Sequence, residues 1–90
     1  MLYRMSRISK KNFERIASDA VSALYSSYPV PLTTRAIARE VARDNEFIKR
    51  VLVFLESRKL VVRVKKDYER WVKWKLSRAA KRRMDVSRRY

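Results

Sequence analysis

Basic side chains crowd residues 61–76, and their density suits the binding of a polyanion. Like charges on so short a segment repel one another unless something anionic approaches, and nucleic-acid phosphates attract Lys and Arg strongly. The segment therefore predicts salt-sensitive contacts to phosphates, which give affinity without sequence information. The alternative is a solubilising edge strand, because lysine at a sheet edge also blocks aggregation. The predicted phosphate contacts here are Arg63, Lys65, Lys66, Arg70, Lys73 and Lys75.

A second group of candidate residues falls on one face of a helix predicted over residues 45–58, where Glu46 and Ser57 also lie. Arginine or lysine binds guanine O6 and N7, asparagine pairs with adenine, and an apolar side chain contacts the thymine methyl. The face therefore suits base reading in a major groove; the alternative is an ordinary solvated face. The predicted base contacts are Asn45, Lys49, Arg50 and Val53.

One aromatic residue and several further residues complete the candidate set. Trp71 lies among the basic residues of its strand and is a candidate for stacking on a base. It also suits packing beneath Lys and Arg stems, or a place in a dimer surface. The remaining predicted phosphate contacts come from a helix over residues 34–42 and from a terminal basic tract: Thr34, Arg35, Arg39, Arg78, Lys81 and Arg82.

The composition argues against catalysis and metal binding, because the chain has no His, Cys or Gly. Nucleophile–base pairs, zinc sites and phosphate-cradling loops normally need those residues. We therefore expect no enzyme, metal, cofactor or small-molecule substrate. No signal-peptide pattern and no apolar run of about 18 residues appears, so we expect a cytoplasmic, nucleoid-associated protein without a membrane partner. Abundant Arg, Lys and Glu without glycine is typical of a hyperthermophile.

The net charge of +15 is unevenly placed along the chain. Residues 1–11 hold four basic and no acidic side chains, and residues 12–58 hold seven basic and six acidic ones. Residues 59–90 hold thirteen basic and three acidic side chains. A solvated surface tends to mix its signs, so the one-sign C-terminal third indicates a polyanionic partner.

Three helices are predicted before the basic segment. The first begins after an Asn12 cap and ends near residues 27–28, since the two following prolines cannot continue it. The second is capped by Thr33 or Thr34 and the third by Asp44 or Asn45. Apolar residues recur at helical spacing in all three and form one stripe each.

Residues 60–76 predict a β-hairpin followed by a final helix. Val62 and Val64 alternate with Arg63 and Lys65, the period of two of a half-buried strand. A return strand is expected over residues 70–76, after a four-residue tip at 66–69. Ser77 is expected to cap the last helix, with Ala80 and Met84 facing inward.

Several segments resemble small prokaryotic winged helix-turn-helix regulators. Residues 32–41 resemble the first helix of the helix-turn-helix, and residues 48–56 resemble the recognition helix. Residues 60–63 and 74–77 are similar to the two sides of the wing. The resemblance implies nucleic-acid binding, often as a dimer, in an archaeal or viral setting. Such families place glycine after the recognition helix; this chain has Lys59, so we expect a different closure of that helix end.

Together these observations predict a mainly α protein with a small β-hairpin. We expect a basic arm at residues 1–11, a winged helix-turn-helix at 12–76 and a basic terminal helix at 77–90. The leading hypothesis is a homodimeric regulator or chromatin-associated factor that binds duplex DNA, with helix 45–58 in the major groove and the wing on phosphates. The alternative is an accessory subunit of a larger machine, such as a ribosome, polymerase or replication complex, that holds RNA or DNA beside other subunits.

Overall fold

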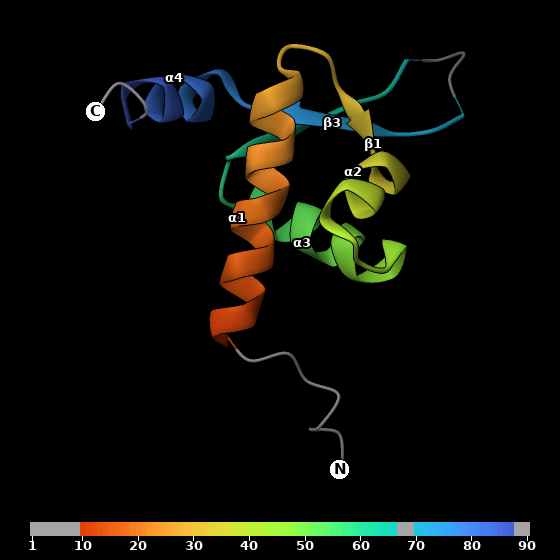
Figure 1. Ribbon diagram of the computed structural model, residues 1–90. Helices are drawn as coiled ribbons and strands as arrows, with labels where there is room; N and C mark the ends of the chain where they lie inside the picture. The colour runs from red at the N-terminus through yellow and green to blue at the C-terminus, as the bar shows by residue number, and fades with distance from the viewer. Residues whose placement is uncertain (1–9, 67–69, 88–90) are drawn as a thin grey trace.

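The computed structural model describes residues 10–66 and 70–87 (Figure 1). The predicted hairpin tip, apart from Lys66, lies outside the described residues, as do the first nine and last three residues. The elements in chain order are α1 Lys10–Ser27, β1 Leu32–Thr33, α2 Thr34–Val41, α3 Asn45–Ser57, β2 Val61–Val64, β3 Lys73–Leu76 and α4 Arg78–Ser87.

Helix α1 starts earlier than expected and ends where expected. Lys10 and Lys11 already belong to the helix, so the prediction of Asn12 as its N-cap is wrong. The helix stops at Ser27, immediately before the segment that holds Pro29 and Pro31. Its apolar stripe turns inward as the periodicity predicts, and the buried residues are Ile16, Ala17, Ala20 and Leu24.

Side-chain caps fix the starts of the next two helices. The hydroxyl of Thr33 accepts a hydrogen bond from the Ala36 amide at 3.1 Å, at the start of α2. The carboxylate of Asp44 accepts one from the Phe47 amide at 3.4 Å, at the start of α3. Of the two alternatives for each cap, the first residue is therefore the N-cap in both helices.

The end of α3 corrects the expectation about the missing glycine. Lys59 adopts a left-handed conformation with φ 63°. Its amide donates to the Glu56 carbonyl at 2.9 Å, and the Leu60 amide donates to the Leu55 carbonyl at 3.0 Å. These two bonds make a Schellman motif, so lysine closes the helix in the conformation usually given to glycine. Ala42, with φ 57°, ends α2 in the same way.

The sheet has three antiparallel strands in the order β1-β3-β2, one more than the predicted hairpin. Strand β1 pairs with β3 through Leu32 opposite Trp74. Strand β3 begins at Lys73, three residues later than the predicted start at Arg70, and Trp71 lies outside the ladder.

The register also corrects the inner face of β2. Val61 lies opposite Leu76 and Arg63 opposite Trp74, so Arg63 shares a face with the buried tryptophan. Val62 pairs with Lys75 on the outer face and is 38% exposed. The predicted alternation treated Val62 as part of the apolar face; Val61 is the residue that fills the core instead.

The core lies between the three helices and the inner face of the sheet, with Trp74 at 1% exposure. Helix α4 extends from the end of β3 near the C-terminal end of α1 (Figure 1). Ser77 caps α4 by accepting from the Ala80 amide at 3.1 Å, and Ala80 is buried, both as predicted. Within residues 10–66 and 70–87, no helix combines the length and apolar character needed to cross a bilayer.

Candidate nucleic-acid interface

The exposed face of α3 brings the four predicted base contacts together. Asn45, Lys49 and Arg50 are exposed, and Val53 is 43% exposed. Spacings of three and four residues align them along one side of the helix. The opposite side holds the buried stripe Ile48, Val51, Leu52 and Leu55. The core therefore fixes which side chains α3 presents to a partner.

Helix α2 adds cationic residues beside this face. Arg35 and Arg39 are exposed, and a short turn joins α2 to α3 (Figure 1). Thr34 is less available, because its hydroxyl accepts a hydrogen bond from Trp74 Nε1 at 2.9 Å. That bond anchors the start of α2 to the sheet.

An ion pair joins α3 to the sheet through Glu56, a residue that was not among the predicted site residues. Arg63 donates from Nε and Nη2 to the two carboxylate oxygens of Glu56, at 3.1 and 2.8 Å. The hydrogen bond from Arg63 lowers the pKa of Glu56, and the same bond raises the pKa of Arg63. The guanidinium also lies 4.8 Å from the centroid of the Trp74 ring.

Arg63 therefore differs from the other predicted phosphate contacts. It links β2, β3 and α3 through Trp74 and Glu56, and Trp74 continues the link to Thr34. A signal for this role existed in the sequence: Arg63 has the same parity as Val61, the buried residue of its strand.

The remaining basic residues of the wing segment lie in two places. Lys65 and Lys66 are exposed beyond the end of β2. Arg70 is exposed, and its guanidinium lies 6.0 Å from the ring centroid of Trp71, which is 64% exposed. Lys73 and Lys75 are half-buried, and their pairing with Val64 and Val62 places them on the outer face of the sheet. The structure thus separates the wing's predicted phosphate contacts into two sets.

The predicted phosphate contacts on helix α4 also differ in their surroundings. Arg78 and Arg82 are exposed. Lys81 instead donates to Asp85 at 2.7 Å and lies 5.4 and 5.1 Å from the ring centroids of Tyr25 and Tyr28. The hydrogen bond with Asp85 raises the pKa of Lys81. Since the Tyr25 hydroxyl donates to the same carboxylate at 2.6 Å, Lys81 belongs to the contact that attaches α4 to α1.

Solved structures share this arrangement of helices and strands. Staphylococcus aureus MepR in complex with DNA matches with a TM-score of 0.74 at 20% identity, over 87% of this chain and 65% of that one. The apo-Zalpha domain of zebrafish PKZ matches with a TM-score of 0.66 at 20% identity, over 72% and 95%. A mutant of Lactococcus lactis ZitR matches with a TM-score of 0.62 at 14% identity, over 91% and 51%. The fold is a winged helix-turn-helix.

In winged-helix terms, α2 and α3 form the helix-turn-helix and β2 and β3 form the wing. The predicted fold class is confirmed, with β1 as an additional strand. No family model and no curated protein matches the sequence. The chain spans less than two thirds of the MepR and ZitR chains, and the likeness to them shows the fold.

Proposed function

We propose that this winged helix binds duplex DNA as a small transcription regulator or chromatin-associated factor. The observation that carries the proposal is the exposed face of α3, where Asn45, Lys49 and Arg50 lie opposite the buried stripe. A helix in this position enters the major groove and meets base edges with residues near its N-terminus. MepR, a transcription regulator with the same fold, has been solved in complex with DNA, which supports the proposal.

In this proposal one set of side chains contacts base edges and another set contacts phosphates. Lys49 and Arg50 approach base edges, since they lie on the first two turns of α3. Lys65, Lys66 and Arg70 are exposed next to the wing tip and contact phosphates, which adds affinity that salt weakens. Arg63 holds the wing against α3 through Glu56 and is not assigned to phosphate.

The test compares Arg50→Ala with Lys66→Ala on a duplex selected from a random pool and on a scrambled duplex. Arg50→Ala is expected to weaken binding to the selected duplex by about tenfold or more, and binding to the scrambled duplex far less. Lys66→Ala should weaken both duplexes alike and lower the slope of log affinity against log salt by about one. Equal losses from Arg50→Ala on both duplexes would remove base reading from the proposal.

A second candidate, a subunit of a larger nucleic-acid machine, is favoured by one apolar patch. Phe54 is 38% exposed beside Val53, and its ring packs edge-on against Phe13 at 5.2 Å. Exposed aromatic and aliphatic side chains on one surface suit contact with another protein. This candidate predicts weak binding to isolated duplexes. Nanomolar duplex affinity of the purified protein would count against it.

A further inference from the structure

Helix α4 presents a face of arginine side chains that the proposed DNA contact of α3 does not use. Arg78, Arg82 and Arg83 are all exposed. Within residues 10–66 and 70–87, the guanidinium groups of these three residues form no hydrogen bond and no ion pair. These guanidinium groups are therefore available to an external anion.

The attachment of α4 removes the helix's only carboxylate from this face. Asp85 is the one acidic residue of α4, and it accepts from Tyr25 on α1 and from Lys81. The negative charge of Asp85 therefore lies on the side of α4 that packs against α1. The outward side carries arginines without a compensating carboxylate from its own helix.

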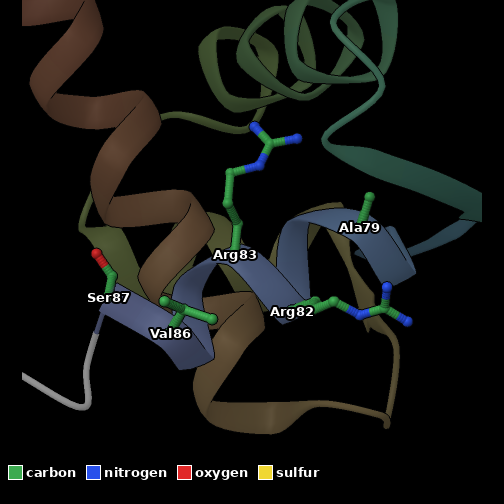
Figure 2. Close-up of a pocket in the computed structure, with 5 residues that line it drawn as sticks. All are labelled: Ala79, Arg82, Arg83, Val86 and Ser87. Carbon is green, nitrogen blue, oxygen red and sulfur yellow. The ribbon is translucent and has the colours of Figure 1, made fainter.

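In the view of Figure 2, Arg83 extends from α4 on the side of the green helix drawn above it, and Arg82 extends in a different direction. The surface between them is hollowed, with a volume of about 530 Å³. Ala79 and Ser87 also line the hollow, and their small side chains leave the backbone of a ligand room to approach. Two guanidinium groups spread in this way suit successive phosphates better than a single carboxylate.

Helix α4 lies apart from the start of the helix-turn-helix. In Figure 1, α2 and the turn before α3 lie on one side of α1, and α4 lies on the other. A duplex that follows the first turns of α3 therefore leaves α4 uncovered. One protein molecule has two separate cationic surfaces.

We propose that α4 is a second nucleic-acid site, which binds the phosphate backbone of a second duplex, so that a single molecule bridges two duplexes. The proposal rests on the DNA-binding function proposed for α3. The α4 face would contact phosphates, which carry no sequence information, so its binding should not depend on base sequence. Val86, which is 51% exposed and lines the same hollow, would suit an acidic protein instead; in that case the protein would bind single duplexes without bridging two.

The experiment measures recovery of a fluorescent duplex on beads that carry a different duplex, as a function of protein concentration. The wild-type protein is expected to recover the second duplex and to lose that recovery at excess protein, when each duplex is saturated separately. Arg82→Ser/Arg83→Ser should lower the maximum recovery by about tenfold, since two phosphate contacts are lost. Arg82→Lys/Arg83→Lys should retain most of it, because lysine also binds phosphate.

Three controls make the outcome decisive. Lys10→Ser/Lys11→Ser removes the same charge from the start of α1 and should leave bridging nearly intact. Light scattering should show the same mass for all variants, and single-duplex affinity for the selected sequence should change little. Three outcomes would each overturn the proposal. The serine variant could bridge at the wild-type level, the wild type could bind single duplexes without bridging them, or bridging could be lost together with a change of mass. Loss of all duplex binding would instead defeat the function proposed for α3.

Discussion

At the scale of single residues, Arg63 has a contact within the fold that its prediction as a phosphate contact did not include. Glu56 receives two hydrogen bonds from Arg63, in the bidentate geometry that gives arginine–carboxylate pairs their specificity. The guanidinium therefore fixes the position of β2 relative to α3. Its effect on DNA binding would come from the orientation of the wing.

Replacement of Glu56 tests this role through pH. Because the bond from Arg63 lowers the pKa of Glu56 below its ordinary 4.5, the pair stabilises the fold above that pH. This stabilisation is lost as the pH falls through the lowered pKa. We expect Glu56→Gln to lower Tm at pH 7 and to approach the wild-type Tm near pH 3, as measured by thermal melts.

The matched control is Glu14→Gln on α1, whose carboxylate forms no ion pair with the described residues. It should change Tm much less at pH 7. A deficit of Glu56→Gln that stays the same from pH 7 to pH 3 would show that the pair has no part in stability.

At the scale of elements, both helices of the helix-turn-helix end in a left-handed residue without glycine. Ala42 ends α2 with φ 57°, and Lys59 follows the cap of α3 with φ 63°. A side chain with a Cβ is strained in this region, whereas glycine is not. The hydrogen bonds of the two Schellman motifs keep these residues there.

Lys59→Gly is expected to raise the free energy of unfolding by about 1 kcal/mol, because relief of left-handed strain exceeds the added entropy of the unfolded chain. Urea denaturation measures the change. Lys59→Ala, which also removes the charge but keeps a Cβ, should show no comparable gain. A gain of equal size in both variants would assign the effect to charge.

The sequence predicted the helices well because their signals are local. The stripe from Ile48 to Leu55 and the cap at Asp44 lie within a few turns of one another. Strand β1 was missed as a sheet member because two residues carry little periodicity and its partner, Trp74, lies about forty residues away. The inner face of β2 was misassigned because two parities were available: Val61 shares one with Arg63, and the contacts of Arg63 with Trp74 and Glu56, which favour it, come from distant residues.

The sequence predicted which residues belong to the candidate site. It did not predict how those residues are distributed over the surfaces of the fold. The face of α3 followed from helical spacing, since the buried stripe determines what lies opposite. The separation of Lys73 and Lys75 from Lys65 depends on pairing across the sheet, and the role of Lys81 depends on Tyr25, far away in the chain.

At the scale of the whole molecule, a net charge of +15 on 90 residues opposes compaction. Glu56 and Asp85 each pair with one of the cationic side chains, and a large positive net charge remains. The fold must therefore hold together against the mutual repulsion of the others.

Salt should accordingly stabilise this protein in the absence of nucleic acid. Raising NaCl from about 20 mM to about 0.3 M shortens the screening length, so we expect Tm to rise by several degrees. Differential scanning calorimetry measures the change. Sucrose at matched osmolarity stabilises by exclusion from the protein surface and does not screen charge, so the rise in salt is compared with the rise in sucrose. A Tm that is unchanged or lower in salt would show that the repulsion is already relieved.

The order of the strands has a consequence for synthesis on the ribosome. Strand β3 is the middle strand, so β1 and β2 have no partner until residues 73–76 have been made. The three helices and both outer strands precede it in the chain. A nascent chain that stops before Trp74 can pack its helices but leaves the start of α2 without the indole N–H that Thr34 accepts. The sheet, the wing and the anchoring of the helix-turn-helix are therefore completed together, once β3 has been made.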